Sequence, residues 1–460
     1  MKGKFKKGIH SRTIQMKDKF YRRRRFTAPQ IILLGFAAVI LIGALLLMLP
    51  ISTCDREGAS FGDALFTSTS AVCVTGLVVR DTGSYFSVFG QCVILLLIQI
   101  GGLGVVTVLS PFFMLTGRGF SLGERSIMLE ASTAPNMSDA VRFTAFAAKI
   151  TFSVELIGAL ALLPVFCSDF GAKGIFMALF HSVSAFCNAG FDILGSEGTP
   201  FASLMPYAAN AALNIPIMLL IVLGGIGFLT WRDVFAHKHH LRKYSLQSKM
   251  VLLATGLLIL LPALYFFFFE FSTLPFGERL LVSLFQAVTP RTAGFNTVSL
   301  TLLSGAGAMI MVLLMLIGGS PGSTAGGMKT TTFAVLFSNM IAVFRRKKHV
   351  ECFGRRLPQD IVKQSATILI LYLSLFFVGA ILISAIDTVP IVTAFYEAAS
   401  AVGTVGLTLG ITPTLGSASR IVLMLLMYFG RVGGLTMIYA AVAAEKNTDS
   451  KFPEERITVG

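Results

Sequence analysis

Four short segments of the chain carry residues whose types and spacing could form one shared site. Each consists of small or hydroxyl-bearing residues and ends at a glycine, and these glycines recur at intervals of 114, 104 and 112 residues. A period of about 110 residues that returns the same motif predicts a fourfold repeat, with one quarter of the site in each copy. The predicted site residues are Val74, Thr75, Gly76, Asn188, Ala189, Gly190, Thr292, Ala293, Gly294, Thr404, Val405 and Gly406.

The chemistry that these segments offer is coordination of a cation by backbone carbonyl oxygens. Each segment is too short to cross a bilayer, and an unpaired carbonyl at membrane depth costs several kcal/mol against lipid. Such a turn persists where it lines a water-filled cavity or binds a ligand that needs oxygen atoms, such as a dehydrated cation. Glycine permits the left-handed backbone that aims successive carbonyls inward. A tight turn would explain one glycine, but four copies predict a selectivity filter.

The composition places the chain among polytopic membrane proteins. Hydrophobic residues make up 54% of the sequence and charged residues 13%, and the mean hydropathy is +0.77. These values lie outside the range of soluble domains. The six cysteines form no Cys-x-x-Cys pair, so neither a disulfide framework nor a zinc site is indicated. We expect no catalytic residues, because the sequence pairs no nucleophile with a base and clusters no metal ligands.

Hydropathy predicts an all-α polytopic fold of four pseudo-symmetric repeats around a central ion pore. Each repeat is predicted to consist of a span, a short amphipathic pore helix, a filter turn and a second span. The eight expected transmembrane helices are 28–50, 87–111, 143–166, 206–231, 249–271, 305–344, 361–386 and 419–444. The four expected re-entrant pore helices are 62–72, 175–187, 277–289 and 390–402.

Positive charges test this topology independently of hydropathy. Of the 38 Lys and Arg residues, 30 fall in segments predicted to be cytoplasmic and six in outer segments, so we expect both termini in the cytoplasm. The basic N-terminal arm is either a topology anchor attracted to anionic lipid or a docking arm for a partner. The predicted divisions are the arm (1–27), repeat 1 (28–115), a cytoplasmic linker with repeat 2 (116–247), repeat 3 with a gate loop (248–350), repeat 4 (351–445) and a C-terminal tail (446–460).

Four motifs resemble those of the Trk/Ktr/HKT superfamily of potassium transporters. They are the segments 70–77, 99–104, 289–297 and 319–329, and the resemblance extends from about Ala28 to Ala444. The bacterial Ktr membrane subunits are the most similar branch, because Trk membrane subunits carry two further N-terminal spans that the basic arm cannot supply. One departure is Cys73, where a hydroxyl residue is commoner in the first filter.

The resemblance implies potassium uptake across the plasma membrane, usually stimulated by sodium. It implies a homodimer in which each chain has its own pore, and a separate cytoplasmic ring of KtrA-like regulatory subunits that bind the nucleotide. No cofactor is then expected in this chain. The only metal expected is the transported potassium, held by filter carbonyls, with sodium as a possible activator. The lipid bilayer is an expected partner and nucleic acid is not.

A broken span and a buried cation predict a gate beneath the filter. Segment 318–327 holds five glycines and a proline in ten residues, which breaks a helix in mid-membrane; in the family this position is an intramembrane gate. Arg431 lies in an apolar span at similar depth, where an unpaired charge costs at least about 3 kcal/mol. We expect the two to hydrogen-bond, although Arg431 could be only a structural tie to loop carbonyls. The gate residues are Gly318, Gly319, Ser320, Pro321, Gly322, Ser323, Thr324, Ala325, Gly326, Gly327 and Arg431.

Other ionisable residues in apolar segments are expected to have supporting roles. We expect Lys329 to reach cytoplasmic water, and Glu397, His181 and Arg291 to hold the filter turns from behind. Glycine-rich motifs in the second spans, at 101–104 and 224–227, indicate close helix packing.

Two other function classes remain open from the residues alone. A carrier of a small organic solute also uses broken helices at the membrane midplane, but it usually has a twofold repeat. A membrane enzyme would need a catalytic cluster that the apolar spans do not supply.

Overall fold

A computed structural model describes residues 27–104, 137–434 and 436–437 of the chain. The predicted basic arm, much of the linker before the second repeat, and the predicted C-terminal tail lie outside these ranges. Helices dominate the described part, and its named strands form a single two-stranded hairpin.

Each predicted repeat begins with a long apolar helix. These are α2 (Ala28–Leu47), α8 (Met137–Phe170), α12 (Leu246–Tyr265, extended by the π-helical η4, Phe266–Glu270) and α16 (Gln359–Asp387). Within the described ranges, these four are long and apolar enough to cross a membrane, and a bent pair, α10 with α11, could make a fifth span. The predicted first spans are therefore present as helices, since uninterrupted apolar sequence of this length satisfies its own backbone hydrogen bonds.

A short helix follows each long one in the predicted position. The short helices are α3 (Phe61–Val72), α9 (Lys173–Phe186), α13 (Phe276–Val288) and α17 (Ile391–Gly403), and each boundary lies within two residues of the prediction. Each packs against the long helix that precedes it, and its C-terminal half is buried. The C-terminal ends of these four helices meet in the core of the molecule.

The second helices of the repeats are shorter than the sequence predicted. They are α5 (Val88–Leu103), α10 (Ala211–Gly225), α14 (Gly305–Leu316) and α18 (Ser417–Val432). Serine or asparagine side chains cap the first three, because Ser87, Asn210 and Ser304 each accept a hydrogen bond from the backbone N–H three residues later.

The cause of the early ends is a glycine with a left-handed backbone. Gly104, Gly227 and Gly433 have φ values of 84°, 88° and 90°, which a right-handed helix cannot accommodate. The prediction of one straight helix over 206–231 is wrong, since α10 and α11 (Phe228–His237) meet at an angle of 97°. The helices predicted over 87–111 and 419–444 likewise stop at Leu103 and Val432, and the remainder of each lies largely outside the described residues.

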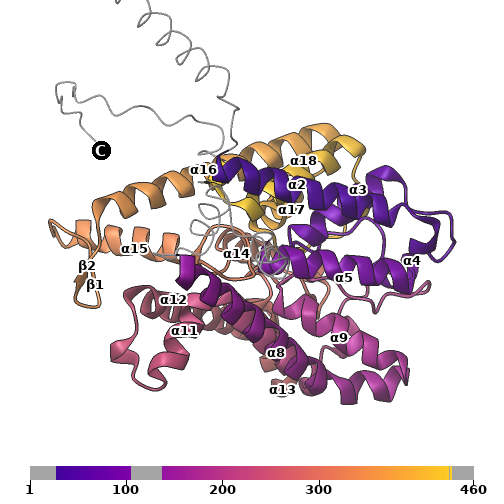
Figure 1. Cartoon of the computed structure of the whole chain (residues 1–460), viewed down its shortest axis with the longest axis horizontal. Coiled ribbons are helices and arrows are strands. Elements are labelled where there is room, and N and C mark those ends of the chain that lie inside the picture. The colour runs from indigo at the N-terminus through magenta and orange to yellow at the C-terminus, as the bar shows by residue number, and fades with distance from the viewer. Residues whose placement is uncertain (1–26, 105–136, 435, 438–460) are drawn as a thin grey trace, which may run out of the picture.

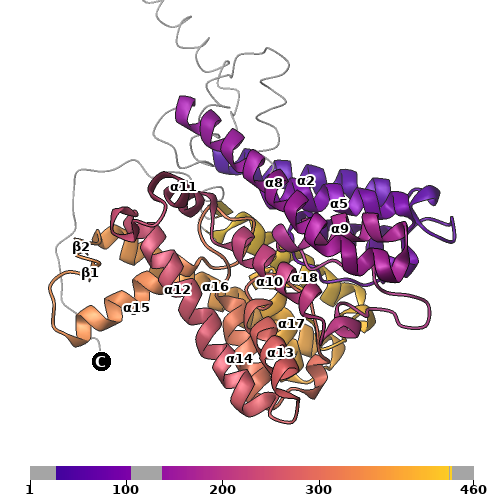
Figure 2. The ribbon, with the colours of Figure 1, turned by 90° about the horizontal axis from the view of Figure 1, so that it is seen from below.

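The second helix of the third repeat is broken as predicted. A loop separates α14 from α15 (Thr330–Phe344), and Gly318 N donates to Met328 O across its base at 2.8 Å. In both views α15 extends to one side of the molecule with the hairpin of β1 (Glu351–Cys352) and β2 (Arg355–Arg356) (Figures 1 and 2). The remaining short elements are α4 (Thr82–Tyr85), η1 (Pro50–Ser52), η2 (Met205–Tyr207), η3 (Leu241–Lys243), η5 (Leu300–Leu302) and η6 (Thr412–Thr414).

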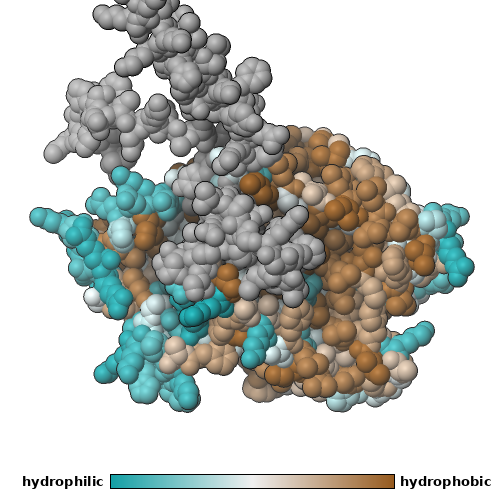
Figure 3. All heavy atoms as spheres, in the orientation of Figure 1, coloured by the Kyte–Doolittle hydropathy of each residue, from teal (hydrophilic) through white to brown (hydrophobic). Residues whose placement is uncertain are grey.

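The surface of the long helices is apolar, as expected of a multi-pass membrane protein. Ile157 on α8, Leu261 on α12 and Ile370 on α16 are 61–66% exposed. Figure 3 shows a broad hydrophobic face bounded by hydrophilic groups at its two edges. Large apolar residues covering a whole face would be unfavourable in water but match a lipid environment.

Candidate functional site: a closed ring of four backbone turns

Each short helix ends in a turn of the same unusual backbone geometry. The residue two places before the glycine has a left-handed φ in every repeat, of 56° at Val74, 60° at Asn188, 69° at Thr292 and 52° at Thr404. The glycines themselves have φ between 68° and 95°. Three of these residues are β-branched, and a left-handed backbone strains such a residue by about 1–3 kcal/mol. The same conformation at the equivalent position of all four repeats indicates that the surrounding structure imposes this turn.

The four turns close into a ring. A Cβ atom on Gly76 would collide with Ala189 O, one on Gly190 with Ala293 O, one on Gly294 with Val405 O and one on Gly406 with Thr75 O. Each glycine therefore packs against the carbonyl of the following repeat, and the fourth repeat returns to the first. The twelve predicted site residues are brought together at one place.

A hydroxyl at the end of each short helix holds its turn. Ser70 Oγ accepts from Gly76 N at 3.1 Å, and Ser400 Oγ accepts from Gly406 N at 3.0 Å. Ser184 Oγ and Thr289 Oγ1 instead donate to the carbonyl after the glycine, at 2.7 and 2.6 Å. Sequence reasoning did not assign these hydroxyls, although their recurrence five or six residues before each glycine was a usable signal.

The turns present carbonyls without internal partners. Among the hydrogen bonds of the described residues, none is accepted by the carbonyls of Thr75, Ala189, Ala293 or Val405. Buried carbonyls are normally paired. Four unpaired carbonyls against a ring of glycines can therefore supply oxygen ligands to a cation.

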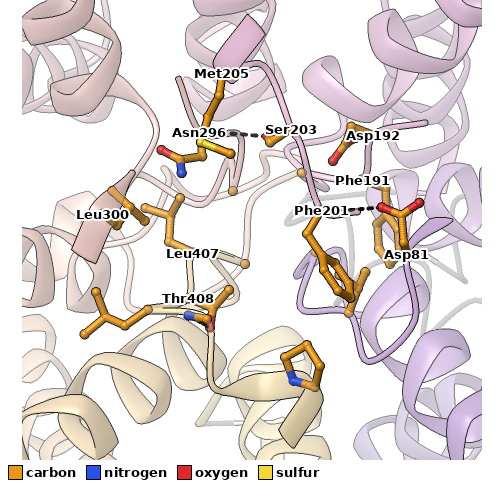
Figure 4. Close-up of a pocket in the computed structure, with 18 of the residues that line it drawn as sticks. Asp81, Phe191, Asp192, Phe201, Ser203, Met205, Asn296, Leu300, Leu407 and Thr408 are labelled. Carbon is orange, nitrogen blue, oxygen red and sulfur yellow. Dashed lines mark hydrogen bonds between the residues drawn. The ribbon is translucent and has the colours of Figure 1, made fainter. Parts of the chain in front are cut away.

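A cavity of about 400 Å³ lies against one side of the ring. All four turn glycines line it, together with two carboxylates, Asp81 and Asp192 (Figure 4). Burial raises the pKa of Asp192 to about 7, and the neighbouring Asp81 carboxylate contributes in the same direction. The cavity therefore gives access to the ring past acidic groups.

The 318–327 loop is bound on the other side of the ring. Ser320 N donates to Gly225 O at 2.9 Å, and Gly327 N donates to Gly430 O at 3.1 Å. Thr324 Oγ1 donates to Phe186 O, at the end of α9, at 3.0 Å. The loop is thus fixed to the ends of α9, α10 and α18.

Arg431 connects this loop to the first repeat. One guanidinium nitrogen donates to Thr324 O, and the other donates to Gly101 O and, at 3.1 Å, to Gly102 O. The expected hydrogen bond between Arg431 and the loop is therefore present. The residue lies in the last turn of α18 rather than in mid-helix, because Gly433 ends that helix early.

Two further cations have partners inside the protein. Lys329 is half-buried, and its Nζ donates to Ala325 O at 2.8 Å and lies 3.5 Å from Gly326 O. The turned-back loop places these carbonyls within reach of the lysine. Arg291, counted among the outer charges, is 5% exposed and reaches back from its turn to Thr255 Oγ1 at 3.2 Å.

Buried polar side chains support the ring from outside. Glu397 accepts from Thr408 Oγ1, from Thr412 Oγ1 at 2.7 Å and from Leu409 N at 3.2 Å, so it holds the chain that leaves the fourth turn. His181 makes one contact of this kind, 2.8 Å from Nδ1 to Met177 O, within its own helix. It does not contact its turn directly.

Sequence reasoning missed a buried carboxylate beside the second turn. Glu155 on α8 is 3% exposed, and its oxygens lie 3.3 Å from Gln99 Nε2 and 3.6 Å from Cys187 Sγ. Cys187 ends α9, directly before the second turn. A lone glutamate within the apolar span 143–166 was the signal that could have found it.

Comparisons with known proteins agree with this architecture. The family model described as TrkH, cation transport protein, matches residues 9–450. The chain is 39% identical over 450 residues to the potassium/sodium uptake protein NtpJ of Enterococcus hirae, covering 95% of this chain and 98% of that protein. It is 38% identical over 451 residues to the Ktr system potassium uptake protein B of Bacillus subtilis, covering 96% and 99%.

A solved structure has the same fold. The crystal structure of the potassium transporter TrkH from Vibrio parahaemolyticus matches with a TM-score of 0.72 at 21% identity, over 91% of this chain and 85% of that one. The family model and the two relatives cover nearly the whole chain, so the predicted resemblance to Trk and Ktr proteins is confirmed. The chain belongs to the TrkH family of cation transport proteins.

Proposed function

We propose that this protein takes up potassium across the plasma membrane through a filter of backbone carbonyls. The observation that carries the proposal is the closed ring of four turns with unpaired carbonyls. The relatives' names support potassium as the cargo, since they are described as potassium/sodium and potassium uptake proteins. The filter residues are the triplets 74–76, 188–190, 292–294 and 404–406.

The filter replaces water around the ion with protein oxygens. A dehydrated potassium ion on the axis of the ring takes carbonyl ligands from all four repeats. The C-terminal ends of α3, α9, α13 and α17 converge on the ring and add partial negative charge. Packing of each glycine against the next repeat keeps the ring from contracting around the smaller sodium ion.

The gate consists of the 318–327 loop and Arg431. The loop is fixed directly beneath the ring, and the guanidinium holds it to the first repeat. In this position the loop obstructs the path and the positive charge repels a descending cation. Ion flow then requires at least some of these hydrogen bonds to break so that the loop can move.

The membrane arrangement is that of eight spans and four re-entrant pore helices. The long helices supply four spans, and the shorter second helices with their continuations supply the others. The distribution of positive charges supports a cytoplasmic location of both termini. We take the repeats and terminal segments with the boundaries inferred from sequence, and the assembly as a homodimer with one pore in each chain.

A soluble nucleotide-binding ring of the KtrA type regulates the gate, and sodium stimulates uptake. The relative named as a component of a Ktr system supports a multi-subunit assembly. The regulatory ring docks on two basic segments, 232–249 and 345–363. The second segment includes the projecting hairpin. Neutralising the Lys and Arg residues of these segments should abolish co-purification with the ring. Full retention would place docking elsewhere and leave lipid binding as the role of the charges.

Rubidium uptake by purified protein in lipid vesicles tests the proposed function. We expect uptake that potassium inhibits much more strongly than sodium does. Absence of uptake in vesicles that contain correctly folded protein, with or without the regulatory ring, would contradict the proposal. Uptake of an organic solute instead would identify a carrier.

A further inference from the structure

We propose that residues 195–205 form a strap across one side of the outer mouth, and that this strap determines which external cations reach the ring. Asp81 is the positioning residue that anchors it. The inference builds on the proposed function, because the ring must be an ion path for access to it to matter.

The strap is an insertion that breaks the fourfold pattern. The second helices begin 12, 21, 11 and 11 residues after Gly76, Gly190, Gly294 and Gly406, respectively. The second repeat alone therefore has about twice the usual connection between its turn and its second helix. The extra residues line the cavity that leads to the ring, through Phe201, Ser203 and Met205.

Two anchors hold the strap between the neighbouring repeats. Phe201 N donates to Asp81 Oδ1 of the first repeat at 2.8 Å. On the third repeat, Asn296 N donates to Ser203 Oγ at 3.0 Å, and Leu204 N donates to Asn296 O at 2.9 Å. Figure 4 shows both anchors on the wall of the cavity. The strap therefore passes in front of its own repeat and joins the two beside it.

The strap backbone has a conformation that requires these anchors. Phe201 and Ser203 have φ values of 58° and 46°, and left-handed residues of this kind persist only where the surroundings hold them. With an anchor removed, each residue can relax to an ordinary φ, which moves its side chain relative to the mouth. The strap is thus held in one position by its contacts and not by its own preferences.

Asp81 is held in place within the first repeat and forms the fixed end of the strap's first anchor. Its carboxylate is 8% exposed and also accepts from Ser84 N at 2.8 Å and Ser84 Oγ at 2.7 Å. Gly195 packs directly on this carboxylate, and a Cβ at that position would overlap both of its oxygens. An alanine at position 195 must therefore shift either the strap or the Asp81 carboxylate, and so disturb this anchor without changing any charge.

The side chains of the strap set the width of the mouth. Phe201 and Met205 are 38% and 37% exposed and line the same cavity as the four turn glycines. A monovalent metal ion passes beside them, but a bulky organic cation needs the strap to move. The strap therefore excludes external tetraethylammonium from the ring.

Three variants and one matched control test the strap. Gly195→Ala disturbs the Asp81 anchor, Ser203→Ala removes the side-chain anchor on the third repeat, and Phe201→Ala removes the bulk while keeping the backbone bond. Gly198→Ala lies in the same segment with no atom within 4 Å of the added Cβ. We expect external tetraethylammonium to inhibit rubidium uptake more strongly in the three variants than in the wild type or in Gly198→Ala. For the two anchor variants, losing one hydrogen bond should raise the sensitivity about five-fold.

A second readout does not depend on transport. In a Cys54→Ser background, which removes an exposed cysteine, Asp192→Cys places a thiol in the cavity. A bulky, membrane-impermeant thiol reagent should modify it about five-fold faster when Gly195→Ala is added, whereas a small reagent should show little difference. Equal rates and equal tetraethylammonium sensitivity in all variants would overturn the strap. Loss of rubidium uptake in the wild type, with the rate difference intact, would overturn the proposed function alone.

Discussion

The ring of turns follows the fourfold repeat, whereas the layer beneath the ring departs from it. In the ring, all four repeats have the same pair of left-handed residues and the same packing of glycine on a neighbouring carbonyl. Beneath it, the second helices of repeats one, two and four stop one or two residues before a glycine with φ of 84–90°, while the third continues into the 318–327 loop.

The fourth repeat departs further in this lower layer. Its motif Gly430-Arg431-Val432-Gly433 carries arginine where the first and second repeats have Gly102 and Gly225. An ion on an axis is best surrounded by equivalent ligands, whereas a single axial path is obstructed by one loop and one cation. The near-fourfold symmetry of the ring therefore fits coordination of an ion, and the loss of that symmetry beneath the ring fits control of ion flow.

The largest expected effect comes from breaking the ring. Gly76→Ser places a Cβ against Ala189 O at a φ of 90°, which adds strain of about 1–3 kcal/mol. We expect the preference for potassium and rubidium over sodium to fall by about ten-fold or more, measured by sodium competition against rubidium uptake. Gly62→Ser is the control, because no atom lies within 4 Å of its added Cβ. Equal preference in Gly76→Ser and wild type would remove the first turn from the filter.

Breaking the lower layer should change rate and leave selectivity intact. Deleting residues 320–325, or substituting Arg431→Ala, removes the obstruction and leaves the carbonyls of the turns in place, so the maximal rate of rubidium uptake should rise and depend less on the regulatory ring. Arg431→Lys should have an intermediate effect, because one ammonium group cannot reproduce the guanidinium fork. Unchanged or abolished uptake in well-folded, inserted variants would leave Arg431 as a structural tie.

The outer mouth should make uptake depend on external pH. Because burial and Asp81 raise the pKa of Asp192 to about 7, this carboxyl is largely neutral at about pH 6 and charged at about pH 8. At low external potassium, the added negative charge should increase uptake by about two- to five-fold over this range. Asp192→Asn should flatten the profile. An unchanged profile in that variant would assign the pH dependence to another group.

The smallest effect is expected at the outer contact between the first and fourth repeats. Asp63 pairs with Arg420 and with Arg80, each at 3.0 Å, and the two arginine side chains are 25% and 54% exposed. Arg80→Ala should cost less than about 1 kcal/mol of stability, because solvent screens an exposed pair. Arg420→Ala should cost about 1–3 kcal/mol, since this less exposed guanidinium bonds to the buried Asp63 and also donates to Pro413 O at 2.8 Å. Thermal unfolding in detergent, with equal shifts for the two variants, would contradict this ordering.

The sequence by itself determined the elements whose causes are local. Apolar runs fixed the long helices, amphipathic runs fixed the four short helices to within two residues, and five glycines with a proline fixed the break at 318–327. Recurrence of glycine at a period of about 110 residues also identified all twelve residues that meet in the ring. The helices and the break depend on hydrogen bonding or conformational preference within a few neighbouring residues, and the recurrence is found by comparing such local segments along the chain.

Only the tertiary structure decided the features that depend on distant neighbours. Val74 and Thr404 have left-handed backbones that their residue types disfavour, because the packing of adjacent repeats imposes that turn. Lys329 returns to its own loop because the loop is held against α10 and α18. The strap likewise takes its position from Asp81 and Asn296, which lie 120 and about 90 residues away from their partners. Such contacts leave no local pattern, since each partner is ordinary in its own segment.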